Sequence, residues 1–296
     1  MIVITGATGH LGRLVVADLL KKVPASEVAV AVRNVEKAAD LAERGVDVRY
    51  ADYEKPETLV AAFRGATKVL LISANEVGKR VAQHRNAVDA IKAASPRLLV
   101  YTSILNADNS GISLAKEHLA TEEMIRQSGV PFTILRNGWY LENYTENLAP
   151  ALQYGAIAGS AGNGRVAAAA RADYAAAAVE VLTTDGHEDK TYELAGEAAF
   201  TMSELAAEVS NAAGKPVAYN NLPPDAYREM LVGVGLPAPV AEMLVDADLG
   251  LERGELASDR DDLRRLIGRS TTSLASAVRA ATSSWSFANG SSSSVK

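Results

Sequence analysis

The chain has 296 residues, of which 48% are hydrophobic, enough to bury the core of one large α/β domain or of a nucleotide domain with a smaller second one. Its formal net charge is −6 and it contains no basic run, which argues against a protein that binds nucleic acid by neutralising phosphates. The absence of cysteine excludes disulfides, thiolate catalysis, iron–sulfur clusters and cysteine zinc sites.

Membrane and metal partners are not expected either. No apolar run reaches the roughly 18 residues that a membrane-spanning helix requires, and a strand-like run begins at residue 2 without the regions of a secretory leader. We therefore expect a cytoplasmic protein. The histidines, at positions 10, 84, 118 and 187, lack the spacing of metal ligands, so no metal site is expected.

The first dozen residues join a strand to a helix through a glycine-rich turn. The run Ile2–Ile4 is β-prone, and apolar residues recur at helical spacing after it. In the motif Gly6-x-x-Gly9-x-x-Gly12, the glycines allow a sharp exit from the strand, close approach of backbone N–H groups to a pyrophosphate, and close packing of the helix. The alternative is a turn that binds nothing. The cofactor-binding residues expected here are Gly6, Ala7, Thr8, Gly9, His10, Leu11 and Gly12.

Strand-like and helix-like segments alternate through the first half of the chain. Further strands are expected at 28–32, 46–50, 68–72, 98–102 and 132–135, and helices at 35–44, 56–63, 79–94 and 113–128. This alternation predicts an α/β fold with a doubly wound parallel sheet of the Rossmann type. Because ligands bind beyond the carboxyl ends of such strands, the polar residues after each strand are the informative ones.

Basic residues follow the second strand. Arg33 comes directly after it and Lys37 one helical turn later, where an NAD-preferring enzyme usually carries an acidic residue for the ribose 2′-hydroxyl. No carboxylate occurs in residues 29–35. A guanidinium matches a 2′-phosphate through its planar fork, which favours NADPH over NADH. A solvated arginine that opens a helix is the alternative.

Small polar residues follow the third and fourth strands. Asp52 either accepts from the adenine amino group or caps the helix that begins near Pro56, and the sequence does not separate these roles. The turn Ser73-Ala74-Asn75 is small enough for a cofactor to lie against its backbone. We expect all four residues to contribute to the cofactor site.

The helix after the fifth strand lacks an expected acid. Conventional short-chain dehydrogenases place a serine after this strand and a Tyr-x-x-x-Lys pair farther on. Ser103 and Lys116 are present, but Ile112 stands where the tyrosine belongs. A ketone needs a proton donor as hydride arrives, whereas a quinone or conjugated cation takes hydride into a delocalised system, so the sequence favours the second kind of acceptor. Lys116 either faces the cofactor or is a surface charge, and His118 is either a proton donor or a packed histidine.

The turn after the sixth strand gathers aromatic and amide side chains. Its expected cofactor-binding residues are Asn137, Gly138 and Trp139, and its expected substrate-binding residues are Trp139, Tyr140, Asn143 and Tyr144. The rings offer surfaces on which an aromatic acceptor can stack, and the amides can donate to its oxygens. Rings that only fill the junction between two lobes are the alternative. Arg171, before a helix expected over 172–183, can also reach this pocket, and Asp173 is expected to supply the helix's N-terminal charge or cap.

Together these motifs resemble the NmrA-like atypical short-chain dehydrogenases, and among them the type 2 NAD(P)H:quinone oxidoreductases and the triphenylmethane reductases. The stretches that carry the resemblance are Gly6–Gly12, Val32–Asn34, Lys116–Glu122, Arg136–Tyr140 and Arg171–Tyr174. The resemblance covers residues 1 to about 280. It implies a Rossmann fold, NADPH as hydride donor, and a planar quinone-like acceptor between the nicotinamide and a small C-terminal lobe. It also implies that the turn from Asn137 to Glu142 lies by the nicotinamide.

The second half is organised differently. A loop-rich excursion is expected over 150–165, strands at 166–169, 191–195 and 217–221, a capping box at Thr201 and Glu204 before a helix, and further helices over 225–280. We therefore expect an NADP-binding domain of residues 1–136, completed by about 166–195, and a substrate-binding lobe of 137–165 and 196–282. Residues 283–296, with seven serines in fourteen positions, are expected to form a disordered tail.

These features favour an NADPH-dependent reductase that transfers hydride directly to quinones or similar planar acceptors. We expect the catalytic residues to be Tyr140, Asn143, Lys116 and His118, and the substrate-binding residues to be Trp139, Tyr140, Asn143, Tyr144 and Arg171. No flavin is implied, because one glycine-rich turn supports one dinucleotide. A non-catalytic NADP(H)-binding redox sensor and a reductase of triphenylmethane dyes stay open as alternatives. The sequence also leaves open the physiological acceptor, transfer of one or two electrons, and whether the chain works alone or as a homodimer.

Overall fold

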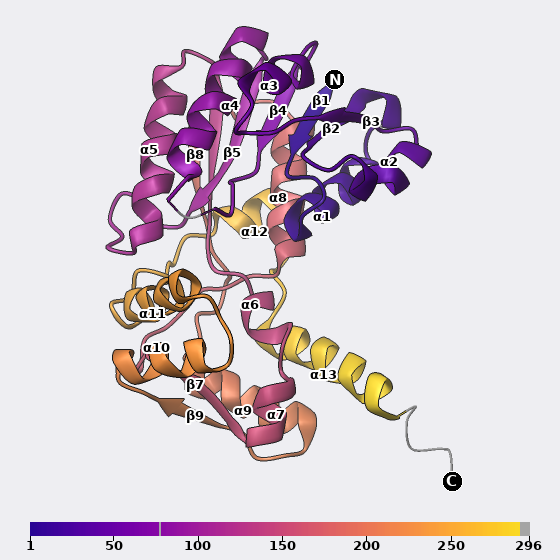
Figure 1. Ribbon diagram of the computed structural model, residues 1–296. Helices are drawn as coiled ribbons and strands as arrows, with labels where there is room; N and C mark the ends of the chain where they lie inside the picture. Colours follow the sequence, from indigo (N-terminus) through magenta and orange to yellow (C-terminus); the bar gives the residue numbers. More distant parts are fainter. Residues whose placement is uncertain (77, 291–296) are drawn as a thin grey trace.

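A seven-stranded parallel sheet forms the centre of the larger, upper part of the molecule in the computed structural model, which describes residues 1–76 and 78–290 (Figure 1). The strand order is β3-β2-β1-β4-β5-β6-β8. The strands are β1 (Ile2–Thr5), β2 (Val28–Val32), β3 (Asp47–Tyr50), β4 (Lys68–Leu71), β5 (Leu98–Ile104), β6 (Phe132–Asn137) and β8 (Lys190–Leu194). Strands β1, β2, β4 and β5 are buried along their whole length, as strands covered on both faces require. The predicted Rossmann-type sheet is confirmed.

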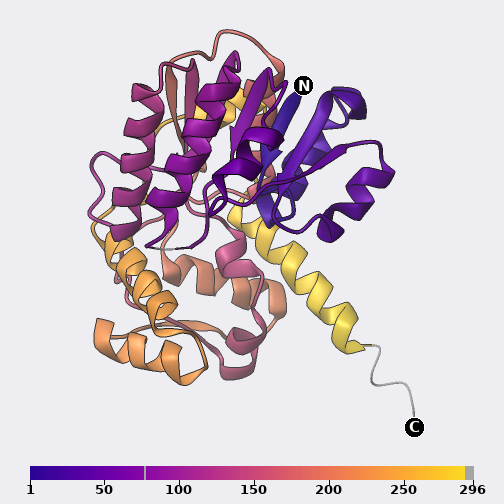
Figure 2. The same cartoon turned by 45° about the horizontal axis from the view of Figure 1, so that its top comes forward.

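Helices cover both faces of this sheet (Figure 2). One face carries α1 (His10–Leu19), α8 (Arg171–Thr183) and α12 (Asp262–Ile267), and the other carries α3 (Pro56–Ala62), α4 (Arg80–Ala94) and α5 (Ser113–Gln127). Shorter connections are η1 (Ala25–Glu27), η2 (Glu36–Ala38) and α2 (Ala39–Glu43). Each face has its own apolar core: Val16 and Val179 belong to one, and Phe63 and Ile91 to the other. These two cores hold the carboxyl ends of the strands in fixed positions.

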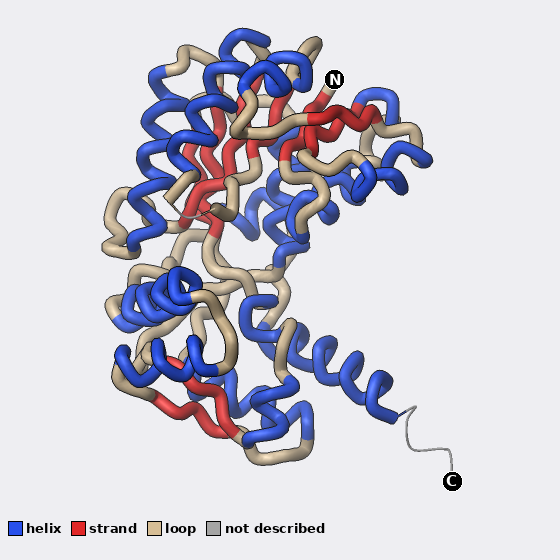
Figure 3. The backbone as a smooth tube through the Cα atoms, viewed as in Figure 1, coloured by secondary structure: helices blue, strands red, loops and turns tan. Residues whose placement is uncertain are grey.

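The smaller, lower part is mostly helical and contains a second, two-stranded parallel sheet (Figure 3). The strands are β7 (Ala156–Gly159) and β9 (Ala218–Asn221), and the helices are α6 (Glu142–Thr145), α7 (Ala149–Tyr154), α9 (Met202–Ala213), α10 (Pro224–Gly233), α11 (Ala238–Glu252) and α13 (Leu274–Gly290). The predicted capping box begins α9: the Thr201 hydroxyl accepts from the Glu204 N–H at 3.1 Å, and the Glu204 carboxylate accepts from the Thr201 N–H at 2.7 Å. Within the described residues, no helix is both long and apolar enough to span a bilayer.

Two expectations for the middle of the chain were wrong. The segment 150–165 is not mainly loop, because it contains most of α7 and all of β7. Residues 166–169 do not form a strand: they make only isolated bridges, one of them between Val166 and Phe200. A run of small apolar residues can fill a tight core without joining a sheet, and periodicity does not distinguish these two outcomes.

One helix of the second half packs with the upper part of the molecule. Helix α12 lies within 196–282, yet Leu263 packs in the same core as α1 and α8 of the upper part. The tail expected from residue 283 begins within helix α13, which runs to Gly290, and 291–296 lie outside the described residues. Alanine-rich sequence before residue 283 favours helix and carries it into the serine-rich segment.

Asp173 provides the acidic first turn expected for α8, but its side chain does not cap that helix. The buried carboxylate accepts from the Thr272 N–H at 2.8 Å and pairs with Arg269 at 2.7 Å. Asp173 therefore ties the segment between α12 and α13 to the start of α8.

Candidate active site

A cavity of about 580 Å³ lies over the carboxyl ends of the strands, at the edge where parallel α/β sheets bind ligands. The turns after β1, β2, β3, β4 and β6 contribute to its walls, together with the end of β5. The lining residues that were predicted from sequence are Gly6, Thr8, Gly9, His10, Leu11, Gly12, Arg33, Lys37, Asp52, Ser73, Ala74, Asn75, His118, Asn137, Gly138, Trp139, Tyr140, Asn143 and Arg171. The fold therefore brings residues from seven separate segments to one cavity.

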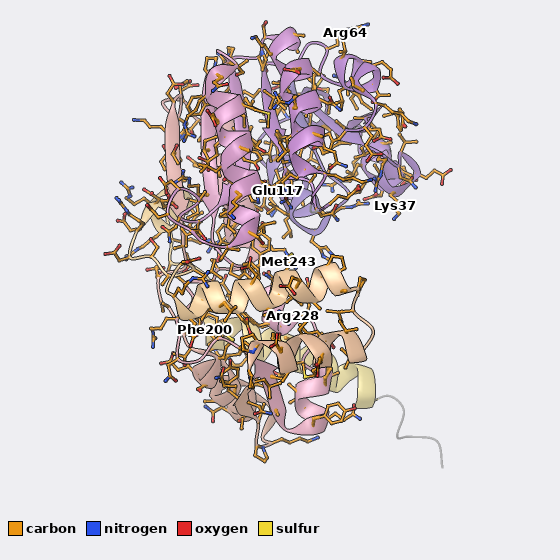
Figure 4. All side chains as sticks on the ribbon, turned by 60° about the vertical axis from the view of Figure 1, so that its left-hand side comes forward. Lys37, Arg64, Glu117, Phe200, Arg228 and Met243 are labelled. Atoms are coloured by element: carbon orange, nitrogen blue, oxygen red, sulfur yellow. The ribbon has the colours of Figure 1, made fainter. Side chains whose placement is uncertain are left out.

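Three predicted site residues do not line this cavity. Ala7 is fully buried in the core beneath the glycine-rich turn. Lys116 is exposed on α5, because a helix that turns His118 inward turns a residue two positions earlier outward. Tyr144 packs its ring edge-on against Phe200, with ring centres 5.9 Å apart, in the lower part of the molecule, where Figure 4 labels Phe200. The catalytic role expected for Lys116 and the substrate contact expected for Tyr144 are thus not supported by their positions.

The glycine-rich turn has the geometry predicted from its spacing. Gly6 has φ of +61°, a conformation that glycine adopts without strain. A Cβ atom at Gly12 would lie 2.3 Å from the Gly6 carbonyl oxygen, so only glycine lets α1 pack this close to the turn. Gly9 is the N-cap of α1 and no side chain caps the helix there. The N–H groups of the first turn of α1 are therefore available to an anion in the cavity.

Basic side chains lie at one end of the cavity. Arg33 is largely exposed, and its Nη1 lies 3.1 Å from Oε1 of Glu76. In the part of the chain that the structure describes, the Lys37 ammonium makes no ion pair, and Figure 4 shows this side chain at the edge of the upper part. Asp52 accepts from the Glu54 N–H at 3.0 Å within its own turn, and no side chain caps α3. Of the two roles weighed for Asp52, capping of that helix is therefore wrong.

Two buried residues of α4 hold the turn after β4, and neither was predicted from sequence. Nε2 of His84 accepts from the Ala74 N–H at 2.9 Å, and Nε of Arg80 donates to the Ala74 carbonyl at 2.7 Å. The proton of His84 therefore lies on Nδ1, which donates to the Thr121 hydroxyl at 2.9 Å. Burial, together with the nearby charge of Arg80, lowers the pKa of His84 to about 3, so the ring is neutral. The four-residue spacing of Arg80 and His84 on one helix face was the available signal.

A buried ionic network lies at the ends of β5 and β6. The Glu122 carboxylate accepts from the Ser103 hydroxyl at 2.6 Å and from Arg136 at 2.8 and 2.9 Å. Arg136 also donates to Glu193 of β8 at 2.7 Å. Burial alone would raise the pKa of Glu122, but the hydrogen bonds from Arg136 and Ser103 outweigh it and lower that pKa. The network joins the three neighbouring strands β5, β6 and β8 to helix α5. The sequence does not show which of these side chains pair.

His118 lines the other end of the cavity. Its Nδ1 lies 2.8 Å from the Tyr101 hydroxyl, and its Nε2 makes no hydrogen bond to any described residue. Burial, with the nearby charge of Arg80, holds the pKa of His118 well below its usual value, so the imidazole is neutral. His118 is therefore a packed histidine with one ring nitrogen left for a ligand, which combines both roles weighed from sequence.

Asn137, the last residue of β6, lines the cavity and carries an unsatisfied acceptor. Oδ1 of Asn137 is buried without a hydrogen-bond partner among the described residues, while its Nδ2 donates to the Tyr140 hydroxyl at 3.5 Å. The Tyr140 ring lies between the Arg171 guanidinium, 5.2 Å from the ring centre, and the Tyr174 ring at 5.3 Å. A buried amide oxygen without a partner costs free energy, so this geometry is suited to a ligand that donates a hydrogen bond.

Arg171 anchors the same turn. Its guanidinium pairs with Glu146 and donates to Oδ1 of Asn143 at 3.4 Å. The amide nitrogen of Asn143 is thereby left to donate elsewhere. Trp139 is partly buried against the core of the lower part and also lines the cavity. Trp139 is thus the aromatic residue that connects the cavity with the lower part.

Comparison with known proteins agrees with this geometry. The NmrA-like family model matches residues 1–276. Quinone oxidoreductase 2 of Escherichia coli (strain K12) is 50% identical over 278 residues, which cover 94% of this chain and 97% of that protein. Its crystal structure complexed with NADPH matches with a TM-score of 0.92, covering 94% of this chain and 98% of that one. The structure of the Citrobacter sp. triphenylmethane reductase complexed with NADP(H) matches with a TM-score of 0.92 at 42% identity. The match covers 95% of this chain and 100% of that one. The chain belongs to the NmrA-like family.

Proposed function

We propose that the protein is an NADPH-dependent reductase that transfers hydride directly to quinones or similar planar conjugated acceptors. The observation that carries this proposal is the single cavity that joins a glycine-rich turn and basic residues at one end to Asn137, Trp139 and Tyr140 at the other. The names of the related proteins support the same chemistry, since one is an NADPH-dependent quinone oxidoreductase and another reduces triphenylmethane dyes.

The residues present suit NADPH along its length. The N–H groups at the start of α1 suit the pyrophosphate, and Gly12 lets this helix pack closely against the Gly6 turn. Arg33 and Lys37 suit the 2′-phosphate. The buried Oδ1 of Asn137 suits the amide N–H of the nicotinamide carboxamide, which would satisfy it. The remaining cofactor-binding residues proposed are Thr8, His10, Leu11, Asp52, Ser73, Ala74, Asn75 and Gly138.

The chain's own contribution is to position the acceptor and to supply hydrogen bonds. Bound NADPH supplies the hydride, and a quinone needs one further proton to become the hydroquinone. Tyr140 accepts from Asn137, which leaves its own proton free, and burial raises its pKa, so the phenol stays protonated at neutral pH. We propose that the Tyr101 hydroxyl donates to Nδ1 of the neutral His118 ring, which places the ring proton on Nε2. We propose Tyr140 as proton donor and His118 as a donor of a hydrogen bond to the acceptor oxygen.

Trp139, Asn143 and Arg171 are proposed to hold the acceptor. Trp139 offers a face for stacking, and the free amide nitrogen of Asn143 can donate to a carbonyl. Arg171 acts through its contacts to Asn143 and the Tyr140 ring. Holding the acceptor in this way supplies orientation and excludes water, which are the protein's main contributions to direct hydride transfer.

Triphenylmethane dyes are the second acceptor class, favoured by the 42% identical reductase of that name. Purified protein mixed with NADPH and menadione should oxidise NADPH well above the rate in buffer, without added flavin, and a triphenylmethane dye should be bleached in the same assay. Binding of NADPH without oxidation by either acceptor would overturn the proposal in favour of a redox sensor. A heat-denatured sample is the control for direct chemical reduction.

A further inference from the structure

An ion pair spans the glycine-rich turn. Strand β1 lies between β2 and β4 in the sheet, Arg33 directly follows β2, and Glu76 lies in the turn after β4. Arg33 Nη1 and Glu76 Oε1 are 3.1 Å apart, and both residues line the cavity. The pair therefore crosses the carboxyl end of β1, where the turn of Gly6 to Gly12 begins. A dinucleotide bound to that turn would lie beside this pair.

The carboxylate of Glu76 is ionised and already forms ion pairs with two basic side chains. Lys79 lies 3.4 Å from its second oxygen and 3.0 Å from Glu54. The hydrogen bond from Arg33, followed by that from Lys79, lowers the pKa of Glu76. At neutral pH the guanidinium of Arg33 thus has an anionic partner within the chain before a phosphate reaches it.

This arrangement affects the two nicotinamide cofactors differently. A 2′-phosphate that binds Arg33 has to displace or share the Glu76 carboxylate, and like charges at such short range repel. The ribose of NADH carries a hydroxyl at the same place, and a hydroxyl can donate to a carboxylate. The sequence lacks a carboxylate in residues 29–35, but the fold brings one to Arg33 from the turn after β4.

We propose that Glu76 is a specificity-determining residue that weakens the preference for NADPH over NADH by competing with the 2′-phosphate for Arg33. This inference rests on the proposed function, because it assumes that a nicotinamide dinucleotide binds the glycine-rich turn. The competition is modest in energy, since the Arg33 and Glu76 side chains are 70% and 34% exposed and exposed ion pairs are weak.

The test is a set of dissociation constants for NADPH and NADH, measured by nicotinamide fluorescence. The variant E76Q keeps the size of the side chain and removes its charge. We expect NADPH to bind about threefold to fivefold more tightly, from loss of a competing exposed ion pair, and NADH to bind equally or more weakly. In the background R33A, E76Q should tighten NADPH less than it does in the unmodified chain, because the competition for the guanidinium is then absent and only direct repulsion remains.

The matched control is E54Q. Glu54 also pairs with Lys79, but it does not contact Arg33 or line the cavity, so its removal should leave the ratio of the two dissociation constants unchanged. If E76Q does not fold, E76A also removes the charge of Glu76 and serves in its place. Thermal unfolding checks that each variant is folded.

An unchanged or weaker affinity of E76Q for NADPH would overturn the inference, as would equal tightening of NADPH and NADH. Tightening of the same size in the R33A background would also overturn it. Failure of the proposed function gives a different result, namely that the unmodified protein binds neither cofactor or never oxidises bound NADPH.

Discussion

Ser103 donates its hydroxyl proton to the buried carboxylate of Glu122, at 2.6 Å, although the residue also lines the cavity. A hydroxyl has one proton, so Ser103 cannot donate to an acceptor while it bonds Glu122. The serine position of conventional short-chain dehydrogenases is here part of a structural network, and Ile112, at the position of their tyrosine, is buried in the core of the lower part.

The first prediction concerns the variant S103A, which removes this hydrogen bond. Because its hydrogen bond is structural, we expect the loss in kcat/KM with menadione to stay within about fivefold, equivalent to roughly 1 kcal/mol, with a similar loss in the free energy of unfolding. Steady-state kinetics and urea unfolding measure the two effects. A loss of activity by two orders of magnitude with unchanged stability would show that Ser103 serves the reaction.

The second prediction concerns the partner of Ser103. Replacing Glu122 by Gln leaves the guanidinium of Arg136 buried with fewer anions, and breaking a buried pair in this way costs about 3–5 kcal/mol. Urea unfolding should give a loss in that range for E122Q. E123Q, on the exposed side of the same helix, is the matched control and should change stability by less than about 0.5 kcal/mol. Equal stabilities of the two variants would contradict the assigned network.

Local sequence was sufficient to predict the sheet and the cofactor end of the cavity. The roles of Gly6 and Gly12 depend on one residue type at one spacing, so the pattern alone predicts them. The positions of Arg33 and Asn137 followed from the rule that ligands bind at the carboxyl ends of parallel strands.

Features that depend on distant packing could not be predicted in this way. Whether Lys116 faces the cavity depends on the rotation of α5 about its axis, and the ring of Tyr144 is directed by Phe200, far away in sequence. The buried pair of Arg80 and His84 acts on Ala74, a contact made only when the turn folds back over α4. Sequence patterns carry no information on such pairings.

The third prediction is a pH dependence of stability from His84. Its pKa falls from 6.5 to about 3 on folding, so the unfolded chain binds a proton that the native state rejects. The stability that this group contributes is present above about pH 6.5 and is lost as the pH falls toward 3. At pH 5 this loss is about 2 kcal/mol.

The variant H84N checks this assignment, because asparagine keeps an acceptor for the Ala74 N–H but does not titrate. Urea unfolding at pH 7 and pH 5 should show a smaller difference for H84N than for the unmodified protein, with the remainder due mainly to the buried His118. An identical pH dependence in both proteins would contradict a neutral buried His84.

The fourth prediction separates the acceptor end from the cofactor end of the cavity. Trp139 lines the cavity and connects it with the lower part, so W139A should raise KM for menadione while the dissociation constant for NADPH changes by less than about twofold. Y154A, at an exposed aromatic residue that does not line the cavity, is the control and should change neither constant. A large loss of NADPH affinity in W139A would mean that the indole belongs to the cofactor site.

The most direct measurement is a single turnover of the purified, flavin-free protein with NADPH and menadione without oxygen, using NADPH labelled with deuterium at either of the two C4 positions. We predict one equivalent of menadiol for each NADPH oxidised and a slower reaction with deuterium at only one of the positions. NADPH that binds in the cavity and stays unoxidised would contradict direct hydride transfer by this protein.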